Sequence, residues 1–163
     1  MALKLILVRH AKSSWKNLEQ ADHERPLNKR GCASAEALGT WLRKQKMQPD
    51  QVLCSSAARA QQTYEMMGFA LDAEVKEGLY HASADVMLRH LQGATGQKVM
   101  LVSHNPGISE FAERLARSLP SHDGFLDYPT GATTVFKFKT DTWDDLKFGS
   151  GKVKKFVVPR ELV

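Results

Sequence analysis

With 163 residues, the chain is long enough to bury one hydrophobic core but short for two independently folded domains. Its 42% hydrophobic and 25% charged residues are ordinary for a soluble globular protein, and no apolar run approaches the about 20 residues that span a bilayer. A net charge of +5 favours anionic partners, yet the basic residues are dispersed and form no nucleic-acid-binding motif. We therefore expect a soluble protein with neither a membrane nor a nucleic-acid partner.

Cysteine usage and the N-terminus indicate a cytoplasmic location. Cys32 and Cys54 lack a CxxC partner and fall within expected regular elements, so we predict two reduced thiols. Lys4 and Arg9 interrupt the first apolar run before a signal-peptide cleavage site can follow. No repeat, linker or change of composition divides the chain, which predicts a single domain over residues 1–163.

The first half of the chain alternates between expected strands and helices. Residues 3–8 form a short apolar run, typical of a strand covered on both faces, and the polar residues 11–25 form a long loop. A helix is expected over 28–46, with an asparagine as its N-cap. Residues 51–56 are expected as a strand, and the helix over 57–67 stops before a glycine.

The second half continues the alternation and then changes character. A short strand is expected within 73–80, a serine-capped helix over 83–92, and a clearly buried strand over 98–103. The alternating segments near 133–139 and 152–159 predict two closing strands of the same sheet, with antiparallel pairing as one option. The fold class is therefore α/β, a three-layer α/β/α sandwich around a mostly parallel sheet.

One more helix is expected after the strand at 98–103. It would extend to Leu119, with Ile108, Phe111, Leu115 and Leu119 spaced along one apolar face. We expect this face to pack against the sheet.

Charged residues follow three of the expected strands. Arg9 and His10 follow the first, Arg59 lies beyond the second, and His104 follows the third. Because ligands of open α/β sheets bind outside the carboxyl ends of the strands, we expect two arginines and two histidines at one site.

These residue types suit phosphoryl transfer. Guanidinium forks match phosphate oxygens, so Arg9 and Arg59 would neutralise the charge that spreads over them in the transition state. Their positive charge disfavours protonation of His10 and keeps a nitrogen lone pair available as a nucleophile. His104 would donate a hydrogen bond to a phosphoryl oxygen.

Taken together, the motifs resemble those of the histidine phosphatase superfamily. Its landmarks are similar to the Arg9-His10 pair, to "SSAARAQQT" at 55–63 and to "SHNPG" at 103–107. The segment "ERPLNKRG" at 24–31 resembles the signature of the small SixA-type phosphohistidine phosphatase branch.

This resemblance extends over nearly the whole chain and implies a fold without a cap domain. It implies that His10 is transiently phosphorylated, that Arg9, Arg59 and His104 bind the phosphoryl group, and that no cofactor takes part. The other histidines lack metal-ligand spacing, so we assign no metal site.

Other candidate residues leave alternatives open. Lys16 replaces the asparagine of mutase-like relatives, which argues against a mutase. We count Lys16 and Arg25 as candidate substrate-binding residues. Arg25 can equally pair with a neighbouring carboxylate. Glu77 has the spacing of the general acid of mutase-like relatives, while a solvated carboxylate explains it equally well. Trp15 either touches substrate or covers the core, and residues 121–132 are expected as a rim loop.

The leading functional prediction is a monomeric phosphatase acting on protein phosphohistidine, such as a phosphorylated histidine phosphotransfer domain, in signal transduction. One alternative is a phosphatase for small phosphate esters that uses the same histidine. Another is a non-catalytic phosphate-binding module, against which the intact His10 and His104 argue. Substrate preference distinguishes the first two, and turnover distinguishes both from the third.

Overall fold

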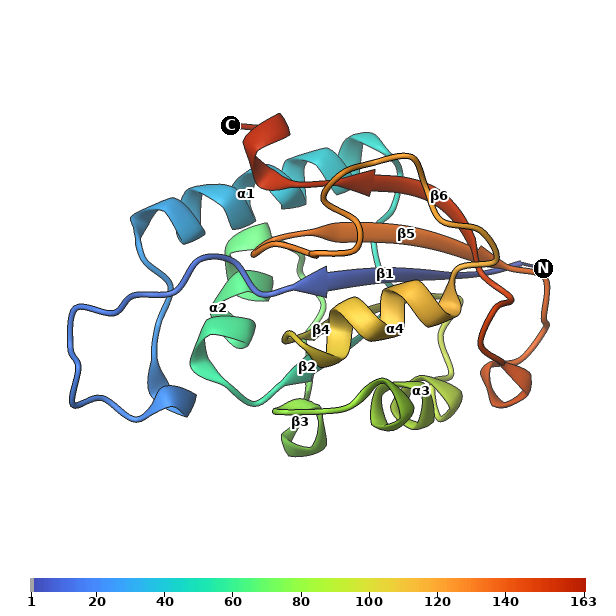
Figure 1. Cartoon of the computed structure of the whole chain (residues 1–163), viewed down its shortest axis with the longest axis horizontal. Helices are drawn as coiled ribbons and strands as arrows, with labels where there is room; N and C mark the ends of the chain where they lie inside the picture. Colours follow the sequence, from blue (N-terminus) through green and yellow to red (C-terminus); the bar gives the residue numbers. More distant parts are fainter. Residues whose placement is uncertain (1) are drawn as a thin grey trace.

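The computed structural model describes residues 2–163, which form one six-stranded sheet flanked by helices (Figure 1). The strands, in sheet order, are β3 (Glu74–Lys76), β2 (Gln51–Ser55), β4 (Lys98–Ser103), β1 (Leu3–Arg9), β5 (Thr133–Phe138) and β6 (Lys152–Val157). The α-helices are α1 (Lys29–Lys44), α2 (Ala58–Met67), α3 (Ala84–Gln92) and α4 (Gly107–Leu115). Short 3₁₀ helices are η1 (Asp22–Glu24), η2 (Glu77–Leu79), η3 (Trp143–Asp145) and η4 (Pro159–Glu161).

The sheet is mostly parallel, as the sequence predicts. Strands β3, β2, β4 and β1 pair in parallel, whereas β5 is antiparallel to β1 and β6 is antiparallel to β5. The register pairs Arg9 of β1 with Ser103 of β4, so both strands end at the same edge. Arg9-His10 and His104 therefore emerge side by side.

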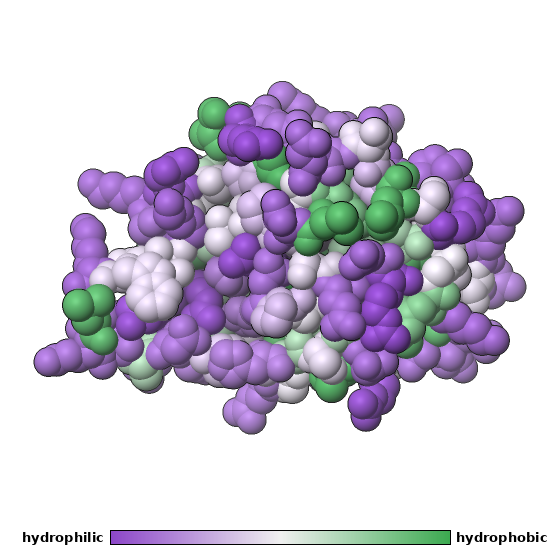
Figure 2. All heavy atoms as spheres, in the orientation of Figure 1, coloured by the Kyte–Doolittle hydropathy of each residue, from purple (hydrophilic) through white to green (hydrophobic). Residues whose placement is uncertain are grey.

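Helices cover both faces of this sheet and complete the predicted three layers. On β1, Leu5 and Leu7 pack in the core formed with α3 and α4, whereas Ile6 and Val8 pack in the core formed with α1 and α2. All four side chains are buried, which explains why β1 appears in the sequence as an unbroken apolar run. Within residues 2–163, no helix is both long and apolar enough to cross a membrane. The face drawn in Figure 2 is mainly hydrophilic, with apolar groups scattered over it.

The expected helix after β4 is shorter than predicted, and the placement of Leu119 on its inner face is wrong. Helix α4 ends at Leu115, and Leu119 is exposed. Ala116 is extended and bridges to Gly151, while the Arg117 N–H donates to the Gly151 carbonyl at 2.7 Å. Pairing with the segment before β6 therefore replaces the last helical turn.

The loop between β1 and α1 extends past the end of the sheet, at the left of Figure 1, and is anchored at the start of α1. The Asn28 N–H donates to the Lys12 carbonyl at 3.0 Å, and the Asn28 side chain caps the Gly31 N–H at 2.8 Å. A Cβ at Gly31 would lie 2.1 Å from the Lys12 oxygen. Glycine therefore permits the close approach that holds this loop beside the carboxyl edge of β1 and β4.

The segment at 121–132, expected as a rim loop, also contributes to the core. Phe125 and Tyr128 are buried, and the Tyr128 hydroxyl donates to the Leu7 carbonyl at 2.8 Å. The backbone oxygen of Tyr128 in turn accepts a hydrogen bond from Arg9 Nη1 at 3.0 Å. The segment thus connects the core to the first strand and to its charged end.

Candidate active site

A cavity of about 590 Å³ opens at the carboxyl edge of β1 and β4. It is lined by Arg9, His10, Lys12, Ser13, Trp15, Asp22, Arg59, His81, His104, Asn105 and Thr130. The four residues that the sequence singled out most strongly (Arg9, His10, Arg59 and His104) are all in this set. The fold therefore brings together side chains that are up to 95 positions apart, counted from Arg9 to His104.

His10 is buried and held in one tautomer. Its Nδ1 lies 2.7 Å from the Ala11 carbonyl oxygen. Because a carbonyl only accepts, Nδ1 carries the hydrogen, and in the neutral ring the lone pair is on Nε2. Burial, reinforced by the Arg9 and Arg59 cations, lowers the pKa of His10 to about 4. The imidazole is therefore neutral at physiological pH and has a nucleophilic nitrogen.

Arg9 is half-buried beside this nucleophile. Its Nη1 donates to the Tyr128 carbonyl at 3.0 Å, and its buried Nε has no hydrogen-bond partner among the described residues. Burial and the nearby Arg59 lower its pKa, although an arginine side chain stays charged. Two neighbouring guanidinium groups, one with an unsatisfied donor, create a strong preference for an anion.

Arg59 lies on the first turn of α2 and is oriented by Asp22. Its Nη1 donates to the Asp22 carbonyl at 2.7 Å, and its Nη2 donates to Asp22 Oδ2 at 3.0 Å. The same Oδ2 accepts from the Tyr80 hydroxyl at 2.5 Å. The hydrogen bond from Tyr80, together with Arg59, holds the pKa of Asp22 below its ordinary range, so this carboxylate is ionised at neutral pH.

His104 is buried opposite His10, with the two ring centres 5.1 Å apart. Its Nε2 lies 2.6 Å from Ser55 Oγ, which also accepts from the Ala57 N–H at 3.3 Å. The Ser55 hydroxyl can donate to or accept from this nitrogen, and Nδ1 of His104 is buried without a partner among the described residues, so Nδ1 is the ring nitrogen left for a ligand. Burial, His10 and Arg59 lower the pKa of His104 to about 3, so its ring is neutral at physiological pH.

Three further predicted site residues lie off this cavity. Lys16 is exposed and lines a separate hollow with Leu27 and Asn28. Arg25 is buried, and its Nη1 donates to the Asn17 carbonyl at 3.1 Å. Glu77 begins η2 and is exposed; like the other two, it is absent from the cavity lining in the described chain. The roles assigned to these three residues stay predictions.

Asp22 is the functional residue that sequence reasoning missed. In the sequence it stands out only as one of the neighbouring carboxylates that could pair with Arg25, although it lies two residues before the segment 24–31 that resembles a family signature. Its ion pair with Arg59 joins positions 37 apart, and no local spacing rule reports such a contact. The proximity of Asp22 to that signature was the available signal.

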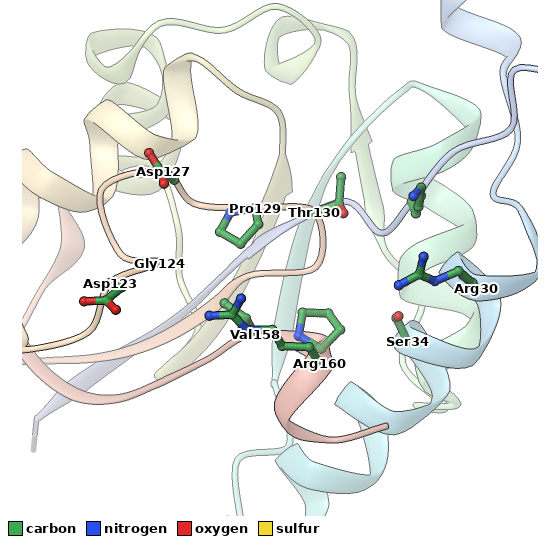
Figure 3. A pocket seen from close by; sticks show the side chains of 11 residues that line it. Arg30, Ser34, Asp123, Gly124, Asp127, Pro129, Thr130, Val158 and Arg160 are labelled. Atoms are coloured by element: carbon green, nitrogen blue, oxygen red, sulfur yellow. The ribbon is translucent and has the colours of Figure 1, made fainter.

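A second cleft, of about 520 Å³, adjoins the catalytic cavity (Figure 3). Lys12 and Thr130 line both hollows, so the two meet at these residues. Arg30 on α1 faces the segment that carries Asp123 and Asp127 across the cleft. Space for a substrate therefore extends beyond the cation cluster around His10.

Comparison with known proteins identifies the family to which this chain belongs. A model of the histidine phosphatase superfamily (branch 1) matches residues 5–80. An uncharacterized protein of Mycobacterium leprae is 32% identical over 162 residues, which cover 94% of this chain and 100% of that protein. The phosphohistidine phosphatase SixA of Escherichia coli is 31% identical over 113 residues, covering 64% of this chain and 68% of SixA.

A solved structure of a protein named SixA from Nakamurella multipartitia has a TM-score of 0.87 and 28% identity, covering 98% of this chain and 97% of that one. The similarity in sequence and fold supports a phosphatase that uses a histidine mechanism. The chain belongs to the histidine phosphatase superfamily.

Proposed function

We propose that the protein removes phosphoryl groups from protein phosphohistidine through a covalent intermediate on His10. The observation that carries this proposal is the state of His10. Its Nδ1 hydrogen is engaged by Ala11, so its Nε2 lone pair is free, and the ring stays neutral between two arginines. A neutral imidazole in a cationic cavity is suited to attack a phosphorus atom.

The first chemical step transfers the phosphoryl group to the protein. Arg9 and Arg59 bind the phosphoryl oxygens, and His10 Nε2 forms a bond to phosphorus as the P–N bond of the substrate breaks. The electron pair of that bond returns to the substrate imidazole, which leaves as a neutral ring when its other nitrogen carries a hydrogen. His10 then bears the phosphoryl group on Nε2 and donates from Nδ1 to Ala11.

The second step restores the protein. A water molecule attacks the phosphorus, the P–Nε2 bond breaks, and its electron pair returns to His10. The water protons stay with the phosphate or pass to solvent, and inorganic phosphate leaves. His104 and the two arginines stabilise the charged oxygens in both steps.

The protonation state of the cavity favours phosphohistidine over an alkyl ester. An alkoxide leaving group needs a proton from a general acid, whereas a protonated phosphoimidazole releases a neutral ring. Asp22 is the carboxyl group in the described lining of the cavity, and its lowered pKa leaves it ionised. Glu77 does not line this cavity. A general acid of the carboxyl type is therefore missing from the described lining.

The surroundings of the cavity favour a substrate larger than a metabolite. The adjoining cleft adds about 520 Å³ at Lys12 and Thr130, where the polypeptide around a phosphorylated side chain can lie. A histidine phosphotransfer domain, whose phosphorylated histidine projects from a helix, is the class of partner that we propose.

The test compares phosphate release from three substrates: a phosphorylated histidine phosphotransfer domain, a phosphoserine peptide and a sugar phosphate. The proposal predicts a kcat/KM for the first at least about a hundredfold above the other two, and loss of all turnover in His10→Ala. Preference for the sugar phosphate would keep the mechanism and overturn the substrate. No turnover of any substrate would favour a phosphate-binding module.

A further inference from the structure

We propose that Trp15 is a stacking platform that selects substrates in which a planar ring carries the phosphoryl group. This inference rests on the proposed function and specifies the substrate class of the same site. It concerns how the leaving group binds. The cation cluster around His10 is assigned to the phosphoryl group instead.

The position of Trp15 is the first observation. Its side chain lines the catalytic cavity together with Arg9 and His10, yet the residue is 62% exposed. An indole is large and mainly apolar, and folding normally buries much of it. An exposed indole at the mouth of a polar cavity is therefore available to a ligand.

A buried cation beneath the indole is the second observation. The Arg25 guanidinium lies 4.1 Å from the centre of the Trp15 ring, while Arg25 itself is 6% exposed. In the described chain, Arg25 does not line the cavity, whereas Trp15 does. Arg25 therefore covers one face of the indole through a cation–π contact made outside the cavity lining, which supports the indole at the mouth of the cavity.

The loop that carries Trp15 is tied on both sides of the indole. The Ser14 N–H donates to the Pro26 carbonyl at 2.8 Å, and Ser13 bridges to Leu27. Arg25 is itself held by its hydrogen bond to the Asn17 carbonyl. The indole is thus pre-positioned at the cavity, which lowers the entropic cost of stacking a ligand on it.

The chemistry of an indole then defines the ligand. Its face binds another planar ring by offset stacking, and a protonated phosphoimidazole adds a positive charge to that ring. A phosphoryl group on an imidazole or a phenyl ring presents such a plane next to the phosphorus atom. Serine phosphates and sugar phosphates lack it, so Trp15 discriminates against them.

The test uses two phosphonates that differ only in the ring: phenylphosphonate and methylphosphonate. Neither is hydrolysed, so calorimetric titration measures binding without turnover. Trp15→Ala is expected to raise the Kd of phenylphosphonate about three- to tenfold and to leave that of methylphosphonate within about twofold. Trp15→Phe, which retains a ring, should recover part of the loss.

Leu18→Ala is the matched control, because Leu18 is 80% exposed in the same loop and does not line the cavity among the described residues. It should leave both Kd values unchanged. Equal weakening of the two phosphonates by Trp15→Ala, or no change in either, would overturn the inference. Ring-selective loss without turnover of phosphohistidine would instead retain the platform and reject the proposed function.

Discussion

Asp22 and Arg59 are joined by two hydrogen bonds, one to the backbone carbonyl and one to the side-chain carboxylate of Asp22, at 2.7 and 3.0 Å. This pair links η1 in the loop after β1 to the first turn of α2. Tyr80 completes the link by donating to the same carboxylate oxygen. The orientation of Arg59, which we propose to bind the phosphoryl group, therefore depends on a residue 37 positions earlier in the chain.

The first prediction concerns this link. Asp22→Ala removes one of the two acceptors of Arg59, and we expect kcat/KM to fall about tenfold because the guanidinium is less well oriented. Asp22→Asn retains a side-chain oxygen and should lose less. Steady-state kinetics on a phosphorylated histidine phosphotransfer domain measures both. Wild-type kinetics in Asp22→Ala would show that Arg59 needs no such support.

The second prediction concerns the protonation of His10. Its pKa is lowered to about 4, so its imidazole resonances in an NMR titration should shift with a midpoint near 4, well below the ordinary 6.5. The neutral nucleophile then persists down to about pH 4. Arg59→Gln removes one of the neighbouring cations and should raise the midpoint. A midpoint near 6.5 in the wild type would contradict the conclusion that burial and the two arginines lower the pKa of His10.

The same shift affects stability with a defined sign. The unfolded chain binds a proton on His10 below about pH 6.5, whereas the folded chain does so only below about pH 4. The free energy of unfolding should therefore fall as the pH drops from 6.5 towards 4, by up to about 3 kcal/mol from this residue. In His10→Asn, the dependence on pH over this interval should be weaker.

Much of the fold follows from local patterns in the sequence. Both faces of β1 and β4 are covered, so these strands appear in the sequence as apolar runs, and the runs predict buried strands. Asn28 and Ser83 cap α1 and α3 as expected. The placement of Arg9-His10 and His104 at one edge follows from the parallel pairing of two strands. These features depend on neighbours in sequence or on one general rule of sheet topology.

Features that depend on distant contacts were not predictable. The pairing of Ala116 with Gly151 ends α4 early, and only the folded chain brings these residues together. Tyr128 is buried and donates a hydrogen bond to Leu7, 121 positions away, although its Gly- and Pro-containing surroundings suggest an exposed loop. The pairing of Asp22 with Arg59 is a long-range contact of the same kind.

The third prediction concerns Gly31. An added methyl group would lie 2.1 Å from the Lys12 carbonyl, so Gly31→Ala forces the loop at 11–16 away from α1. We expect a loss of stability of about 2 kcal/mol or more, measured by urea unfolding. Gly93→Ala is the control, because the nearest atom to its Cβ would be 3.5 Å away. Equal stability of both variants would contradict the close approach at Gly31.

The fourth prediction separates Glu77 from catalysis. Glu77 is exposed in η2 and does not line the cavity among the described residues. Glu77→Gln should therefore leave turnover of phosphohistidine and of an alkyl phosphate within about twofold of the wild type, since its carboxyl group lies outside the cavity that contains His10. Slower turnover of the alkyl phosphate alone would identify Glu77 as the general acid and imply movement of η2 towards His10.

The most direct test of the account is to trap the phosphorylated protein. A single turnover of a phosphorylated histidine phosphotransfer domain, quenched in alkaline denaturant where phosphohistidine survives, is analysed by peptide mass spectrometry. The account predicts one phosphoryl group on the peptide that contains His10, and none in His10→Asn. Phosphate release at the wild-type rate by His10→Asn, or a phosphoryl group trapped on a different residue, would contradict it.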